Sequence, residues 1–276
     1  MNLEGTQIAL LGCGWLGMPL AKKLIRHGAL VKGSVTSESG LEVLKQEGIE
    51  PHLIEVTPDF DHRQHERFFL SEILIIDFPP ARRKDIVLYL TFQMRGLIEA
   101  IKYNKIKKIL FVSSTSVYPA NNLVVKEADA RNPEKESGKA LLEGERLIMS
   151  NKGSDTTIIR FGGLIGYDRN PARFLSGSKA VKKNGHVPVN LIHQDDCINI
   201  IMEIIRKDKW NQIYNACAPE HPLRYVFYSL AARKCGYQEP VFDENAIESY
   251  KIIDSSKLIS DLKYIFKYPN PLSIFD

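Results

Sequence analysis

The chain has 276 residues, of which 44% are hydrophobic and 25% charged, and its formal net charge is +4. These values are typical of a soluble globular protein, and the length permits either one large α/β domain or a core domain with a small appendage. Basic residues are spread along the chain among acidic ones, which argues against a nucleic-acid surface. No apolar run approaches the roughly 20 residues of a membrane span, and no secretion signal precedes the first strand.

The four cysteines lack the close Cys and His spacing of a metal site, so we expect no metal and a reduced, cytoplasmic protein; they are Cys13, Cys197, Cys217 and Cys235.

Short apolar runs alternate with helical segments through the first two-thirds of the chain. Strands are predicted at Ile8–Leu11, Leu30–Val35, Pro51–Val56, Ile73–Phe78, Ile109–Ser113 and Thr156–Phe161. Helices are predicted at Pro19–His27, Glu38–Gly48, Asp85–Tyr103 and Lys139–Ser150. This alternation predicts an α/β protein with a doubly wound parallel sheet covered on both faces. Loops rich in Gly, Pro and Asn then predict a small C-terminal α/β region.

A glycine motif, Gly12-Cys13-Gly14-Trp15-Leu16-Gly17, lies between the first predicted strand and helix. In a Rossmann fold the first glycine permits the tight turn, the second admits a pyrophosphate, and the third allows close helix packing. We therefore expect a dinucleotide-binding Rossmann core over residues 1–165. A mainly substrate-binding region would cover residues 166–276, with a segment near 190–220 returning to the core. The alternative is a structural turn without a ligand.

The end of the second predicted strand bears on the choice of cofactor. NAD is commonly bound through an acid at this position, but the chain has Thr36 and Ser37 and no acid before Glu38. This pattern favours NADP slightly over NAD, although no arginine lies beside Thr36 to hold a 2′-phosphate. A polar strand exit without a role in binding is the other interpretation.

Four further segments resemble, in the correct order, motifs of the extended short-chain dehydrogenase/reductases, the NAD-dependent epimerase/dehydratase family. They are Phe111–Tyr118 ("SSxxVYG"), Pro133–Lys139 followed by Glu143 ("PYxxxK…E"), Ile159–Gly166 ("LRxxxxxG") and Asn190–Asp196 ("xxIHVDD"). The resemblance implies a Rossmann domain with a small substrate-binding region. It also implies a small-molecule substrate and a homodimer formed through the two long helices.

The same resemblance implies a catalytic set of Ser or Thr, Tyr and Lys. Ser114 matches the serine, which would hydrogen-bond the substrate oxygen, and Lys139 matches the lysine, which would also hold the nicotinamide ribose. The tyrosine position is occupied by Lys135, so this chain departs from the family there. A lysine is ordinarily protonated at neutral pH and cannot accept a proton.

Three interpretations of this departure remain open. Lys135 is a surface residue in a site that has lost redox chemistry, Tyr118 or Tyr167 replaces the missing phenol, or Lys135 itself acts. The family's sugar 4,6-dehydratases carry an Asp-Glu pair after the serine, where this chain has Thr115 and Ser116. That difference argues against a dehydratase.

The resemblance also assigns residues around the cofactor and the substrate. Glu55 and Val56 match a pair that contacts adenine, or they are a plain strand exit. Phe78 and Pro79 replace a small turn near the cofactor, with Arg82 as a positive partner for its phosphates or as a solvated side chain. The remaining assignments are Ser113, Phe161, Gly162 and Gly163 near the cofactor, and Arg173 and Lys179 on a substrate anion or on a charged helix face.

Two functions follow from these observations. The first is an NAD(P)-dependent oxidoreductase or epimerase-like enzyme acting on a hydroxylated small molecule, such as a nucleotide-sugar derivative. The second is a cofactor-binding sensor or regulator without turnover, which the missing tyrosine favours.

Overall fold

The computed structural model describes residues 2–175 and 181–276. The chain divides into two compact units. The first unit comprises Met1–Val117, Asn132–Arg160 and Ile201–Ile213, and the second comprises Tyr118–Arg131, Phe161–Ile200 and Tyr214–Asp276.

The main sheet has seven strands in the order β10-β7-β5-β4-β1-β2-β3. They are β1 (Gln7–Leu11), β2 (Leu30–Val35), β3 (Glu50–Leu53), β4 (Ile73–Ile76), β5 (Lys108–Ser114), β7 (Asp155–Phe161) and β10 (Ile213–Ala216). The pairs β1–β2, β1–β4, β2–β3 and β4–β5 are all parallel. The strands after β1 are added first on one side, as β2 and β3, and then on the other side, from β4 onwards. This reversal of strand order is that of a doubly wound fold, which confirms the predicted fold class.

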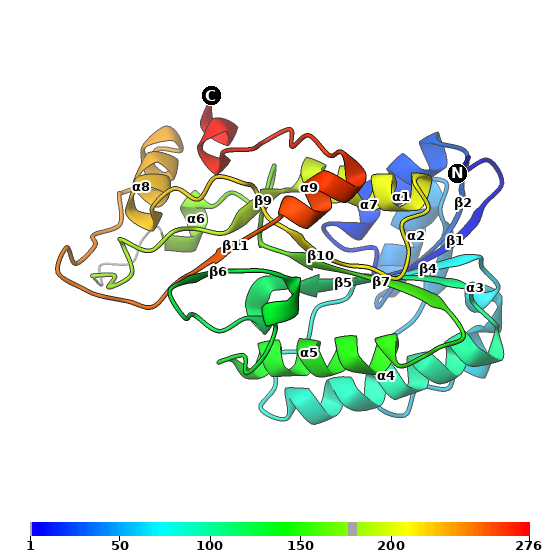
Figure 1. Ribbon diagram of the computed structural model, residues 1–276. Helices are drawn as coiled ribbons and strands as arrows, with labels where there is room; N and C mark the ends of the chain where they lie inside the picture. Colours follow the sequence, from blue (N-terminus) through cyan, green and yellow to red (C-terminus); the bar gives the residue numbers. More distant parts are fainter. Residues whose placement is uncertain (1, 176–180) are drawn as a thin grey trace. The chain divides into compact units, whose positions relative to one another are not determined.

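Helices cover both faces of this sheet, as Figure 1 shows for the first unit. The helices α4 and α5 lie side by side along one face, and α1 and α2 lie on the other. The helices of the chain are α1 (Gly17–Arg26), α2 (Glu38–Gln46), α3 (Glu66–Phe69), α4 (Ile86–Tyr103), α5 (Glu136–Met149), α6 (Ala172–Leu175), α7 (Gln194–Arg206), α8 (Arg224–Lys234) and α9 (Ser256–Leu262). All four residues of β4 are fully buried, as expected for a parallel strand covered twice.

Short 3-10 segments add local turns at η1 (His62–His65), η2 (Thr115–Val117), η3 (Glu127–Asp129) and η4 (Pro271–Phe275). In the second unit, β6 (Leu123–Val125) pairs in parallel with β11 (Lys251–Ile253), and β8 (Gly163–Ile165) pairs in parallel with β9 (Leu191–His193). The Asn190 side chain joins a loop to β11, donating to the Lys251 carbonyl at 2.8 Å and accepting from the Ile253 N–H at 2.9 Å.

All predicted strands and helices are present, with shifted ends. The strand predicted at Pro51–Val56 ends at Leu53, and the one predicted at Ile73–Phe78 ends at Ile76. The residues that follow these shorter strands therefore lie in loops. The bounds of the two units also differ from the predicted domains, because Tyr118–Arg131 belongs to the second unit.

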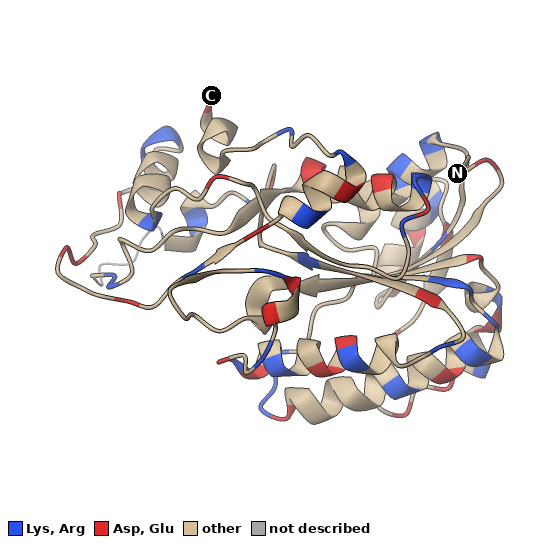
Figure 2. Ribbon diagram, in the orientation of Figure 1, with Lys and Arg blue, Asp and Glu red and all other residues tan. Residues whose placement is uncertain are grey.

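Charged residues of both signs alternate along α4 and α5 in Figure 2, with no stretch of a single sign in that view. Among the described residues, no helix is both long and apolar enough to cross a membrane.

Candidate functional site

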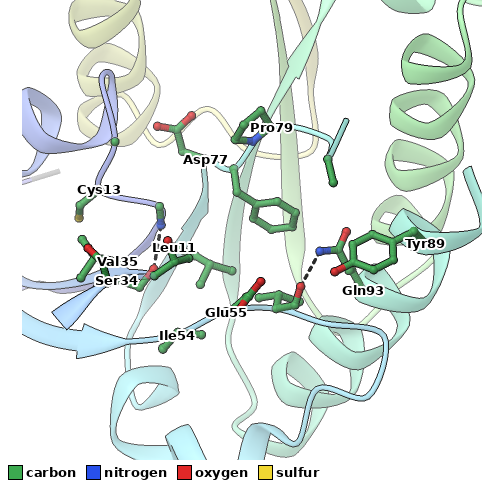
Figure 3. Close-up of a pocket in the computed structure, with 17 residues that line it drawn as sticks. Leu11, Cys13, Ser34, Val35, Ile54, Glu55, Asp77, Pro79, Tyr89 and Gln93 are labelled. Atoms are coloured by element: carbon green, nitrogen blue, oxygen red, sulfur yellow. Dashed lines mark hydrogen bonds between the residues drawn. The ribbon is translucent and has the colours of Figure 1, made fainter. Parts of the chain in front are cut away.

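A pocket of about 390 Å³ lies at the carboxyl ends of β1, β2, β3 and β4, within the first unit (Figure 3). This is the end at which open α/β sheets bind their ligands. The pocket is lined by Leu11, Gly12, Cys13, Gly14, Ser34, Val35, Thr36, Ser37, Ile54, Glu55, Val56, Asp77, Phe78, Pro79, Ala81, Tyr89 and Gln93. Nine of these residues were assigned to a cofactor from the sequence, so the structure brings half of that set of eighteen together in the pocket.

The glycine turn is held against β2 and β4 by its backbone. The Gly12 N–H donates to the Ser34 hydroxyl at 2.9 Å, and the Cys13 N–H donates to the Ser34 carbonyl at 2.8 Å. Gly12 has φ +109°, and a Cβ there would lie 2.2 Å from the Asp77 carbonyl oxygen. Only glycine fits this turn without a shift of the backbone.

The two other glycines have different surroundings. A Cβ on Gly17 would lie 2.1 Å from the Gly12 carbonyl oxygen, so this glycine allows α1 to pack onto the turn. A Cβ on Gly14 would meet nothing within 4 Å, so this glycine borders open space in the pocket. The first turn of α1 contains no acidic residue, which leaves its positive dipole end available to an anion.

The far side of the pocket is mostly apolar. Ile54 and Val56 follow β3, Phe78 and Pro79 follow β4, and all four line the pocket. Helix α4 adds Tyr89 and Gln93, which are one helical turn apart and were not identified from the sequence. Their i, i+4 spacing on the helix after β4 is the signal that could have found them. A planar, apolar group fits between such walls.

Asp77 is a further lining residue that was not assigned from the sequence. It follows β4 directly, it is half-buried, and its Oδ2 lies 3.3 Å from the position of a Cβ on Gly17. In Figure 3 its carboxyl group lies between the Cys13 turn and Pro79. Burial raises the pKa of this carboxyl to about 8, so a large share of it is protonated at neutral pH. The signal was a polar residue directly after an apolar strand.

Charge in the pocket is acidic rather than basic. Of the described residues that line it, two are acids, Glu55 and Asp77, and none is Lys, Arg or His. Burial raises the pKa of the Cys13 thiol to about 12, so this cysteine is an inert packing residue at neutral pH.

Several residues assigned to the cofactor do not line the pocket: Trp15, Leu16, Gly17, Arg82 and Ser113. The Arg82 side chain is exposed. Its neighbour Arg83 instead places its guanidinium 4.0 Å from the Tyr89 ring centroid and donates to Asp85 at 2.5 Å. The arginine that contacts the pocket-lining Tyr89 is therefore Arg83, whereas Arg82 had been expected beside the pocket.

Ser113 belongs to a buried polar cluster. Its hydroxyl donates to Glu145 at 2.5 Å, and Arg160 forms an ion pair with the same carboxylate at 2.6 Å. Both charged side chains are less than 5% exposed. The serine therefore helps to satisfy a buried ion pair between β5, α5 and β7.

Ser114 and Lys139 lie on neighbouring elements of the first unit. A Cβ on Gly138 would lie 2.3 Å from the Ser116 carbonyl oxygen, so this glycine allows α5 to pack closely on η2. The Ser114 hydroxyl accepts from the Ser116 N–H at 3.2 Å. The Lys139 ammonium is exposed and donates to Glu136 at 2.6 Å. Lys135, at the family's tyrosine position, is exposed just before α5.

Tyr118 and Tyr167 belong to the second unit, and a partner holds each hydroxyl. Tyr118 is 1% exposed and donates to the Asn215 Oδ1 at 2.6 Å. Tyr167 is 69% exposed and donates to Asp195 at 2.9 Å. The hydrogen bond to Asp195 raises the pKa of Tyr167, so less of this tyrosine is present at neutral pH as the phenolate that accepts a proton.

The other assigned residues of the second unit have structural contacts. The Gly162 N–H donates to the Ala216 carbonyl at 2.9 Å, and the Gly163 N–H donates to the Asn190 carbonyl at 2.7 Å. Phe161 is buried. The exposed Arg173 donates to the Tyr237 hydroxyl at 3.4 Å. Lys179 lies outside the described residues.

Metal-ligating side chains do not gather in residues 2–175 and 181–276, where no group of three or more His, Cys, Asp and Glu could hold an ion.

This chain is similar in sequence to one named protein and similar in fold to several solved structures. No family model matches the sequence. Protein YeeZ of Escherichia coli strain K12 is 36% identical over 270 residues, which cover 96% of this chain and 97% of YeeZ. ADP-L-glycero-D-manno-heptose-6-epimerase of Helicobacter pylori has a TM-score of 0.80 at 17% identity, covering 100% of this chain and 95% of the epimerase. dTDP-glucose 4,6-dehydratase of Bacillus anthracis, in complex with NAD, has a TM-score of 0.80 at 11% identity, covering 97% and 94%.

These likenesses agree with the motifs and with the pocket at the glycine turn. The chain belongs to the family of protein YeeZ, and its fold is that of the extended short-chain dehydrogenase/reductases, the NAD-dependent epimerase/dehydratase family.

Proposed function

We propose that this protein binds a nicotinamide dinucleotide in the pocket of the first unit. The observation that carries the proposal is the glycine turn, where Gly14 leaves open space beside a helix start without acidic residues. An anionic pyrophosphate fits there, the ribose fits beside Thr36 and Ser37, and the base fits between the apolar walls beyond them. The NAD in the complex of the similar dehydratase also supports it.

NAD is our choice of cofactor, although the strand exit at Thr36 favoured NADP in the sequence. A 2′-phosphate needs a cation beside the ribose, and none of the described lining residues is basic. Hydroxyls at Thr36 and Ser37 can hydrogen-bond the ribose without adding charge.

The reaction we propose is that of an oxidoreductase or epimerase-like enzyme acting on a hydroxylated small molecule. The names of similar proteins suggest a nucleotide-sugar derivative as the substrate class. The dinucleotide would accept or donate a hydride when bound. Ser114 would hydrogen-bond the substrate oxygen, and Lys139 would leave Glu136 to hold the nicotinamide ribose. Tyr118 or Tyr167 would supply the proton transfer only after losing its present partner.

A sensor without turnover is the second candidate, and a specific observation favours it. Lys135 is exposed, and the hydroxyls of Tyr118 and Tyr167 donate to Asn215 and Asp195. Cofactor binding needs none of these groups.

The test is a titration of the purified protein with NADH and with NADPH, followed by nicotinamide fluorescence and thermal unfolding. A ligand at about 100 times its Kd stabilises the folded state by about 2.7 kcal/mol. We expect NADH to raise the melting temperature at lower concentration than NADPH does. Absence of any shift with either cofactor contradicts the proposal. Turnover with nucleotide sugars then separates the enzyme from the sensor.

A further inference from the structure

One wall of the pocket contains an amide with a hydrogen-bond acceptor that has no partner. Gln93 is 7% exposed and lines the pocket from α4. Its Nε2 donates to the Val56 carbonyl oxygen at 2.5 Å, whereas its Oε1 is buried without a hydrogen-bond partner. Such a buried acceptor has lost its hydrogen bond to water and gained none in return, so a donor that reaches it is favoured.

The orientation of this amide is fixed by chemistry. The Val56 carbonyl can only accept, so the NH₂ group of Gln93 must face it and the oxygen must face away. Figure 3 shows this arrangement, with the Gln93 nitrogen on the dashed bond and the oxygen on the other side of the amide, near Tyr89. The buried Oε1 of Gln93 can therefore take part only as the acceptor of a hydrogen bond.

The place of Gln93 within the pocket indicates which part of a ligand would supply that donor. The glycine turn and Thr36 occupy one side, where the pyrophosphate and ribose of a dinucleotide belong. Gln93 lies on the far side, among Val56, Phe78 and Tyr89. A base placed between these apolar side chains carries its exocyclic group towards α4.

We propose that Gln93 determines base specificity by accepting a hydrogen bond from the exocyclic amine of adenine. The inference rests on the proposed function, because it takes the occupant of the pocket to be a dinucleotide. Tyr89, one turn earlier on α4, shifts to admit the amine, since the Gln93 oxygen is enclosed without ligand. Gln93 also holds the Val56 carbonyl, so one side chain fixes the loop after β3 and selects the base.

Glu55 is the competing acceptor. It lines the same pocket, and the family resemblance assigns it to the adenine. Its side chain is exposed, however, and it can satisfy its oxygens with water when the amine is missing. The buried Gln93 oxygen has no such alternative, so a base without an amine costs more there.

The experiment compares the affinities of NAD and nicotinamide hypoxanthine dinucleotide by calorimetry, using the full-length protein. Hypoxanthine presents a carbonyl oxygen where adenine has the amine, which places two acceptors face to face. We expect the wild-type protein to bind the hypoxanthine analogue at least about tenfold more weakly. Gln93→Met keeps the side-chain length and removes the acceptor, and it should reduce the ratio to near one. Glu55→Met, a matched change in the same pocket, should keep the ratio.

Three results overturn the inference: equal wild-type binding of the two dinucleotides, an unchanged ratio in Gln93→Met, or a ratio lost only in Glu55→Met. A purely structural role of Gln93 would lower both affinities equally. The wild-type comparison also stands if Gln93→Met fails to fold. If the wild-type protein binds neither dinucleotide, the proposed function fails, and this result is distinct from loss of discrimination alone.

Discussion

The pocket at the glycine turn and the surroundings of the two tyrosines differ in what their polar groups contact. Around the pocket, Gly14 borders open space, and the Oε1 of Gln93 is buried without a hydrogen-bond partner. Around Tyr118 and Tyr167, each hydroxyl already donates to a nearby side chain. The first region therefore offers open space and a buried acceptor that a ligand could use, whereas the tyrosine hydroxyls of the second are already hydrogen-bonded.

This difference separates binding from catalysis. A dinucleotide is held largely by backbone geometry, which the chain retains at Gly12, Gly14 and Gly17. Proton transfer needs a side chain with an accessible atom and a suitable pKa, and neither tyrosine offers both. The retained glycine turn and the engaged tyrosine hydroxyls therefore favour cofactor binding over turnover.

The largest expected effect concerns the buried cluster of Ser113, Glu145 and Arg160. Ser113 was assigned to the cofactor, but its hydroxyl donates to Glu145 in this cluster. Glu145→Ala leaves the Arg160 guanidinium buried without its partner, and we expect the free energy of unfolding to fall by about 3–5 kcal/mol. Denaturant unfolding measures it. The matched control is Glu143→Ala, which breaks the exposed pair with Arg146 and should cost at most about 1 kcal/mol. Equal losses in the two variants would contradict the structural role of the cluster.

A pair of glycine variants should separate folding from binding. Gly17→Ala forces a Cβ to within 2.1 Å of the Gly12 carbonyl, so it should destabilise the fold markedly. Gly14→Ala meets no neighbour, so it should leave the melting temperature unchanged and weaken NADH binding at least about tenfold, by obstructing the pyrophosphate. Normal NADH affinity in a folded Gly14→Ala variant would argue that the turn is structural only.

Asp77 gives the pocket a pH dependence. Its pKa is raised from 3.8 to about 8 on folding, so the folded state binds a proton that the unfolded state releases. The contribution to stability is therefore lost as pH rises from about 4 towards 8. Asp77→Asn should remove this loss, making the variant more stable than wild type at pH 8 but not at pH 4. NADH affinity should fall above pH 8 in wild type and stay level in the variant. Identical pH profiles of unfolding in the two proteins would refute this role.

The smallest expected effects concern the two phenols. Tyr118→Phe removes a buried donor from Asn215 and should cost about 1–3 kcal/mol of stability, whereas the exposed Tyr167→Phe should change it by less than about 0.5 kcal/mol. Neither variant should alter NADH affinity. If a substrate is found, loss of turnover in Tyr167→Phe without loss of stability would reverse our comparison of the two regions.

The sheet and its helices could be predicted from sequence because apolar periodicity and the glycine spacing are local signals. The end of the second strand indicated Thr36, and the family resemblance indicated Glu55 and Phe78. All three line the pocket, since residues after parallel strands meet at one edge. Asp77 carries the same strand-exit signal but was not assigned, and Gln93 lies on a helix, where only its i, i+4 spacing from Tyr89 could have indicated it. Their roles depend on the groups that surround them in the folded protein, which leave the Gln93 oxygen without a hydrogen-bond partner and bury the Asp77 carboxyl.

The contacts of Ser113, assigned to the cofactor, and of Tyr118, assigned to catalysis, are long-range contacts that no motif encodes. Ser113 lies in a strand-end motif typical of a cofactor site, but the carboxylate that holds it comes from α5, 32 residues later. Likewise, the partner of Tyr118 is Asn215, 97 residues along the chain.

The most direct test of the central claim is amide hydrogen exchange with and without NADH. Our account predicts slower exchange in the segments that line the pocket, at residues 12–14, 34–37, 54–56 and 77–81, and no change around Tyr167. Protection elsewhere with no change in these segments would contradict the assignment of the pocket to a dinucleotide.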